Sequence, residues 1–143
     1  MVPEEWDALI TFEQVTLALD ASWLKVLETF GDATHLRLEA TGQWQVLGGG
    51  IAPCGPDGHL DLSLPQDRLI VPTAPPGALI GKIGGSSASR TDGSVFTIGS
   101  LCVVAVPDKA VGPLFISVNG AVYRPGGNLT QLRLQISGAR PKF

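Results

Sequence analysis

The stretch that decides the fold runs from residue 77 to residue 138 and reads GALIGKIGGSSASRTDGSVFTIGSLCVVAVPDKAVGPLFISVNGAVYRPGGNLTQLRLQISG. It contains short apolar runs at 78–83, 95–98, 101–106, 114–118 and 132–136, separated by segments rich in Gly, Asn, Asp and Pro. Short runs at about ten-residue spacing with turn signals between them are typical of antiparallel strands. The longest polar interruption, 120–128, comes just before the last run, and we look for function there.

The residues upstream of this stretch carry the same signal. Leu36, Leu38 and Ala40 alternate with polar residues, and residues 60–64 alternate in the same way. This period of two is what a half-buried strand requires. The turn-forming sequence Gly-Pro-Asp-Gly at 55–58 separates these two runs. The sequence therefore predicts an all-β fold, a single antiparallel β-sandwich or jelly roll.

The N-terminal segment leaves two alternatives open. The apolar residues of 9–19 fit a short helix about as well as two short strands, although the alternation at 15–19 favours a strand. We therefore divide the chain into an N-terminal extension at 1–22, strand or short helix, and a sandwich domain at 23–143. No internal repeat or linker divides the larger part.

Composition excludes several classes of protein. The chain has 143 residues, a formal net charge of -3 and no basic footprint that would draw it to nucleic acid. Charged residues make up only 16%, against about 25% in typical soluble domains, which favours a homo-oligomer that buries apolar surface. No apolar run is long enough to span a membrane, and the first residues lack a signal peptide's basic start. The default expectation is a cytoplasmic protein, with export by another route left open.

The residues that could form a catalytic or metal site do not occur at the spacings that known zinc sites, serine hydrolases or phosphate-binding loops require. Cys54 and His59 are close in sequence, but no third or fourth ligand falls at zinc spacing. No G-x-S-x-G elbow occurs, and the run 81–87, Gly-Lys-Ile-Gly-Gly-Ser-Ser, lacks the order of a phosphate-binding loop. The two cysteines, Cys54 and Cys102, suit buried or idle thiols better than a disulfide framework. We expect no enzymatic activity.

The run 77–84, Gly-Ala-Leu-Ile-Gly-Lys-Ile-Gly, resembles the galactose-binding bacterial lectins of the PA-IL (LecA) type. The resemblance continues at 112–119, Gly-Pro-Leu-Phe-Ile-Ser-Val-Asn, and ends with the alternating strand that closes at 136–138, Ile-Ser-Gly. Residues 36–42 and the turn at 55–58 also fit, so the resemblance covers about residues 23–138. It implies a jelly roll of the galactose-binding-domain-like fold that binds carbohydrate through a calcium ion held by the loop before the last strand.

This chain departs from the family at the positions that the resemblance assigns to calcium. The family's aspartate after the penultimate strand falls on Gly120, its loop threonine on Arg124, and the first of its paired asparagines on Gly127. The second asparagine is matched by Asn128, and a tyrosine that supplies a carbonyl falls near Val46. Calcium prefers six to eight oxygen ligands, usually including carboxylates. We therefore predict a degraded calcium site in which Asn128 is the remaining side-chain ligand, and no obligatory cofactor.

The resemblance also assigns the residues that contact sugar. The family's His-Pro-x-Gln segment falls on 64–67, Leu-Pro-Gln-Asp, which keeps Pro65 and replaces Gln by Asp67. In the polar loop, the ring of Tyr123 can stack on a sugar and the guanidinium of Arg124 can donate to hydroxyls. The predicted carbohydrate site is therefore Pro65, Asp67, Tyr123, Arg124 and Asn128.

The leading interpretation is a non-catalytic, lectin-like module that binds a galactoside-type carbohydrate. The alternative is a structural or assembly module that uses the same sandwich to bind a protein partner.

Overall fold

The structure is a computed structural model, and it describes residues 7–18, 23–31, 33–44, 54–59, 69–86, 92–119 and 128–139. Its strands are β1 (Asp7–Ala18), β2 (Leu24–Leu27), β3 (His35–Trp44), β4 (Leu79–Ile83), β5 (Ser94–Thr97), β6 (Leu101–Ala105), β7 (Leu114–Val118) and β8 (Asn128–Ala139). These described residues contain no helix, and hence no helix of the length and apolar character needed to cross a membrane.

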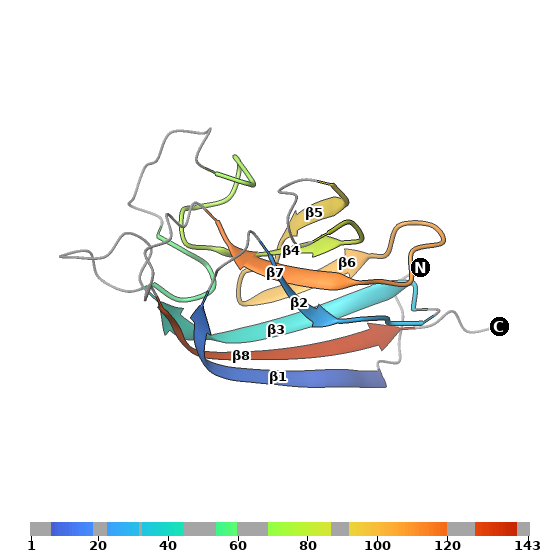
Figure 1. Cartoon of the computed structure of the whole chain (residues 1–143), viewed down its shortest axis with the longest axis horizontal. Coiled ribbons are helices and arrows are strands. Elements are labelled where there is room, and N and C mark those ends of the chain that lie inside the picture. The colour runs from blue at the N-terminus through green and yellow to red at the C-terminus, as the bar shows by residue number, and fades with distance from the viewer. Residues whose placement is uncertain are drawn as a thin grey trace.

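The strands form two antiparallel sheets that lie one over the other (Figure 1). One sheet has the order β1-β8-β3-β6 and the other the order β2-β7-β4-β5. Consecutive strands belong to different sheets throughout, except for β4 and β5, which pair with each other in the same sheet. The predicted all-β sandwich is confirmed.

The core lies between the sheets and follows the alternation seen in the sequence. Leu36 and Leu38 of β3 are fully buried, while Arg37 and Glu39 lie on the outer face with partly exposed side chains. On the neighbouring β8, Leu134 is fully buried in the same core. At the ~25 cal/mol per Å² gained by burying apolar surface, this shared core is the main stabilising contribution.

The second sheet is buried on both faces in its centre. All five residues of β4 and all five of β7 are buried. The inner face meets the main core, while Trp23, Ile80 and Phe115 form a second cluster that Ile70 and Val71 partly cover. Burial on both faces explains why these two strands read as continuous apolar runs and not as alternating ones.

The described part of the N-terminal segment, residues 7–18, is one long strand and not a helix or two short strands. β1 pairs with β8 over its whole length, from Asp7 opposite Gly138 to Ala18 opposite Asn128. This pairing gives the main-chain N–H and C=O groups of β1 hydrogen-bond partners in β8, which the sequence pattern of β1 alone does not reveal. The alternating segment 60–64 lies outside the described residues.

Candidate functional site

The residues predicted to bind sugar fall almost entirely outside the described part of the chain. Pro65, Asp67, Tyr123 and Arg124 all lie there. Asn128 is the first residue of β8, where its main chain is placed opposite Ala18. The structure does describe His59 and Asn119, the residues that precede these two segments in the sequence.

Asn119, the residue that precedes the predicted sugar loop, is a fully buried anchor. Its Oδ1 accepts a hydrogen bond from the N–H of Val71 at 2.9 Å, and its Nδ2 donates to the carbonyls of Val71 and Ala74 at 2.9 and 3.0 Å. Its main chain bonds Ala78 and Gly77 at 2.9 and 2.7 Å. Both polar atoms of the side chain are thus occupied by protein, so Asn119 fixes the start of the loop and is not a ligand donor.

The Gly-Pro-Asp-Gly turn is confirmed, and its aspartate does more than close the turn. Gly58 N–H donates to Gly55 at 3.0 Å. Asp57 accepts from the N–H and the hydroxyl of Ser100 at 2.9 and 3.1 Å. Gly58 has a φ of +79°, and a Cβ there would lie 2.7 Å from the nitrogen of Ala78. The turn therefore needs glycine at this position and ties the start of β6 to the start of β4.

The two cysteines are thiols of low reactivity. Cys54 is buried with Sγ 3.8 Å from the carbonyl of Gly77, and burial raises its pKa to about 11. Burial also raises the pKa of Cys102 above its ordinary value. Both thiols are protonated at neutral pH, and the thiolate is the nucleophilic form. This agrees with the interpretation of both as buried or idle.

Lys82 is the most unusual charged residue among those described. It is the fourth of the five residues of β4, and its side chain is fully buried. Its Nζ lies 5.1 Å from the ring centre of Trp23 and 5.0 Å from that of Phe115. Contacts of this length with ring faces stabilise a cation. The aromatic pair thus replaces part of the hydration that the ammonium loses on burial.

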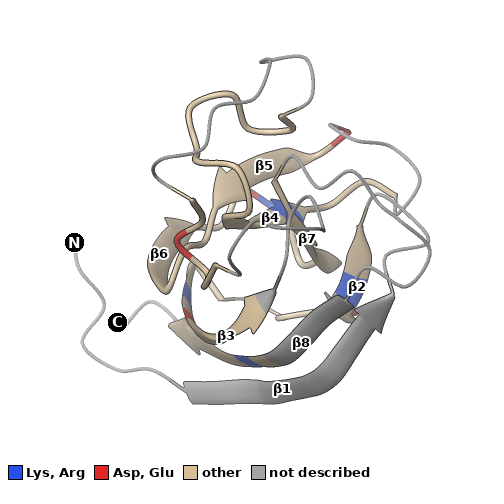
Figure 2. Cartoon of the chain, turned by 90° about the vertical axis from the view of Figure 1, so that its left-hand side faces the viewer, with Lys and Arg blue, Asp and Glu red and all other residues tan. Residues whose placement is uncertain are grey.

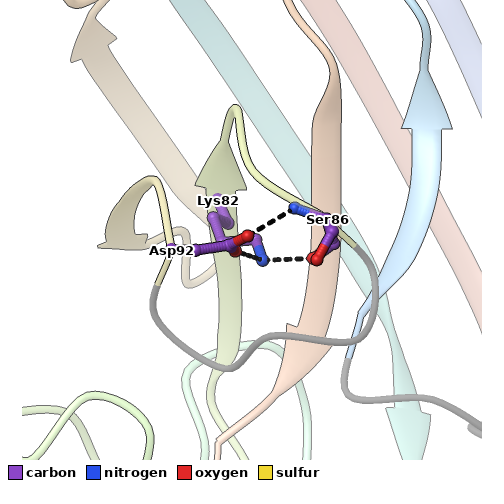
Figure 3. Close-up of polar contacts among 3 residues, drawn as sticks. All are labelled: Lys82, Ser86 and Asp92. Carbon is purple, nitrogen blue, oxygen red and sulfur yellow. Dashed lines mark hydrogen bonds and ion pairs between the residues drawn. The ribbon is translucent and has the colours of Figure 1, made fainter.

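The rest of that hydration is replaced by two oxygen partners (Figure 3). Nζ donates to Asp92 Oδ1 at 2.6 Å and to the carbonyl of Ser86 at 2.5 Å. The second carboxylate oxygen of Asp92 accepts the N–H of Ser86 at 2.9 Å. The hydrogen bond from Lys82 is the main reason that the pKa of Asp92 lies below its ordinary value. The cluster links β4 to Ser86 and Asp92, the described residues at the two ends of the β4–β5 connection. Its role is structural, because the ammonium is inaccessible to a substrate.

The described part of the molecule has a shallow depression on the outer face of the β8-β3-β6 sheet. Its volume is about 440 Å³, and it is lined by Glu39, Ala40, Thr41, Ser100, Leu101, Arg133 and Gln135. The strand register explains the gathering: Glu39 lies opposite both Leu101 and Gln135, and Thr41 lies opposite Arg133. Three separate stretches of sequence therefore meet at one place.

The chemistry of this depression suits a ligand rich in hydroxyl groups. Glu39 supplies an acceptor, Arg133 several donors, and Gln135 both a donor and an acceptor. The hydroxyls of Thr41 and Ser100 add two groups that do both, and Ser100 is held in place by Asp57. Beside them the side chain of Leu101 presents an exposed apolar surface. The depression combines fixed polar groups with an apolar contact.

Sequence reasoning missed this site although it placed some of its residues correctly. Alternation put Arg37, Glu39 and Thr41 on the face away from the core, and they do lie there. It could not show that Arg133 and Gln135 lie beside them, because pairing of β3 with β8 joins residues about ninety positions apart. The available signal was the alternation of polar and apolar residues at 132–136.

The described residues contain no group of three or more His, Cys, Asp or Glu side chains arranged to hold a metal ion. Comparison with protein-family models and with curated proteins finds no match to this chain.

Proposed function

We propose that this chain is a non-catalytic carbohydrate-binding module. The observation that carries the proposal is the depression over β3, β8 and β6, where donors, acceptors and an exposed apolar side chain meet on one rigid sheet. Sugars present hydroxyls that donate and accept at once, next to apolar C–H surface. A site on strands holds such groups more precisely than a site on loops.

The resemblance to PA-IL (LecA)-type lectins supports the same function from independent residues. It assigns Pro65, Asp67, Tyr123, Arg124 and Asn128 to the sugar and makes galactosides the first ligands to test. Arg133 and Gln135 of the depression are the sixth and eighth of the twelve residues of β8, whereas Asn128 is the first. The depression therefore lies over the middle of β8 and is separate from the residues that the resemblance assigns. We infer that binding does not require calcium, since the family's carboxylate position is Gly120.

The test is a glycan array with the purified chain, run once with calcium and once with a chelator. We expect binding to terminal galactosides that the chelator does not abolish. Arg133→Gln should weaken binding about tenfold or more, because a charge-assisted hydrogen bond contributes about 1.5–3 kcal/mol. The matched control is Lys25→Gln, a partly exposed cation of β2 in the other sheet, because Arg37 forms an ion pair with Glu39 of the depression at 3.4 Å.

Each result of this experiment points to a different conclusion. Loss of binding on Arg124→Ala but not on Arg133→Gln would move the site to the loop. Equal effects of Arg133→Gln and Lys25→Gln would remove the depression from the proposal. Binding that the chelator abolishes would contradict the degraded calcium site, and no binding to any glycan would reject the function.

One observation favours the second candidate, an assembly module. Leu101 and Val103 of β6 are exposed at 63% and 55%, and exposed apolar side chains on an edge strand favour protein contacts. A chain that binds no glycan but forms a defined complex with another protein would support this candidate.

A further inference from the structure

Among the described strands, β6 is at the edge of its sheet. Within the described sheets its one neighbour is β3, and the pairing runs from His35 opposite Ala105 to Glu39 opposite Leu101 with no bulge. Its sequence, Leu-Cys-Val-Val-Ala, contains no charged residue and no proline, and the strand is free of charge colouring in Figure 2. Natural proteins usually protect edge strands with charges, proline or bulges. None of these protects β6.

The hydrogen bonds at the two ends of β6 show which way its main chain faces. Ala40 N–H donates to the carbonyl of Ser100, and Val106 N–H donates to the carbonyl of Thr34, both at 2.9 Å. In an antiparallel pair, hydrogen-bonded residues alternate with residues whose N–H and C=O point the other way. Residues 100, 102, 104 and 106 therefore bond β3, and Leu101, Val103 and Ala105 direct their main-chain groups to the open edge.

The same three residues also present their side chains to solvent. Leu101 is 63% and Val103 55% exposed, and Ala105 is exposed as well. The alternate residues Cys102 and Val104 pack against the core. One strip of β6 thus combines main-chain groups without a strand partner in the described sheets and a row of apolar side chains.

We propose that β6 pairs antiparallel with β6 of a second copy of this chain, about a two-fold axis at Val103. Val103 then lies opposite Val103 of the second copy, and Leu101 lies opposite the second copy's Ala105. All three residues that face the edge find a hydrogen-bonded partner, and none is left over. The two sheets become one continuous sheet, and the proposal does not depend on carbohydrate binding.

A second copy fits this edge because an antiparallel strand pairs with itself and because the charges of the neighbouring strand stay far apart. On β3, Arg37 lies opposite Val103 and Glu39 lies opposite Leu101. In the two-fold arrangement each Arg37 is three strand spacings from its counterpart, about 14 Å at the usual 4.7–4.9 Å per strand. This exceeds the screening length of about 8 Å at physiological salt. The two copies of Arg37 therefore do not oppose the pairing.

The first test is the concentration-dependent mass of the full chain by analytical ultracentrifugation. A five-residue edge buries less than the ~800 Å² per partner of a standard interface, so we expect reversible dimers in the micromolar range. Val103→Lys should weaken the dimer about tenfold or more, because it places two ammonium groups opposite each other. Val111→Lys is the matched control, since Val111 is equally exposed at 54% but lies outside β6.

A second variant and a cross-link separate edge pairing from a general loss of solubility or fold. Val103→Pro removes only an N–H that points away from β3, so we expect a folded monomer. Val103→Cys should form an intermolecular disulfide under mild oxidation, because hydrogen-bonded antiparallel pairs have Cα atoms about 5.5 Å apart. Val111→Cys should not. A wild-type monomer throughout the micromolar range, or a dimer that Val103→Lys and Val103→Pro leave intact, would overturn the proposal.

Discussion

Replacing Lys82 and replacing Asp92 should lower the free energy of unfolding by different amounts, although the two residues form one ion pair. The side chain of Lys82 is 0% exposed to solvent, whereas that of Asp92 is 41% exposed. Removing one partner of a buried ion pair typically costs about 3–5 kcal/mol because the other charge is left buried. That penalty applies when Lys82 is the residue left behind.

Lys82→Met leaves a carboxylate that water can reach and an apolar side chain between two rings. The variant loses two cation–π contacts, each about 0.5–2 kcal/mol, and gains sulfur–aromatic contacts of about 0.3–1.5 kcal/mol. We therefore expect a loss of about 1 kcal/mol in the free energy of unfolding. Asp92→Asn keeps the shape but leaves the buried ammonium without a counter-charge. Its loss should be larger, near the lower end of the general range, because Ser86 and the rings still contact the ammonium.

The measurement is urea-induced unfolding at pH 7 of the wild type, both single variants and the double variant. The double variant Lys82→Met with Asp92→Asn should recover most of what Asp92→Asn alone loses. Lys25→Met is the control, because Lys25 forms an exposed ion pair with Glu28 that contributes at most about 1 kcal/mol. Lys82→Met costing as much as Asp92→Asn, or a double variant no more stable than Asp92→Asn, would refute the reasoning.

Two further predictions concern the same framework. The stability difference between wild type and Asp92→Asn should depend on pH, because the pKa of Asp92 is lowered in the folded state, mainly by the hydrogen bond from Lys82. The stabilisation that comes from this lowered pKa is fully present above the unfolded pKa of about 3.9, and it is lost as pH falls through the folded pKa. The urea midpoints of the wild type and Asp92→Asn should therefore converge in acid. Asn119→Ala leaves main-chain groups of Val71 and Ala74 without partners and should cost about 3 kcal/mol by the same assay. Asn119→Asp should not restore it, because a carboxylate cannot donate to the two carbonyls.

The sequence predicted the strands of the sandwich because their local patterns are strong. Alternation at 36–41 places the buried and outer faces of β3 correctly, and the continuous run at 114–118 is the doubly buried β7. The N-terminal segment stayed ambiguous because its pattern fits two periods. Only its pairing with β8 makes it a single strand.

The functional features were harder to predict because they depend on contacts between distant residues. Lys82 lies in a run that superficially suggests a phosphate-binding loop, yet it is buried against Trp23 and paired with Asp92. A lysine inside an apolar strand, with an aspartate ten residues later across a hairpin, was the signal for an internal ion pair. The depression on the outer face depends on the register of β3 with β8, which no local pattern specifies.

The two proposals reinforce each other through geometry, although each stands alone. Leu101 lines the depression and also lies on the open edge of β6. In the proposed dimer the two copies of Leu101 are four residues apart along the paired strands, about 14 Å at 3.4 Å per residue. Two depressions then open on the same face of one continuous sheet. A shallow, open site binds a single sugar weakly, and a rigid pair of sites lets one branched or repeated glycan engage both, so that the second contact occurs at high effective concentration.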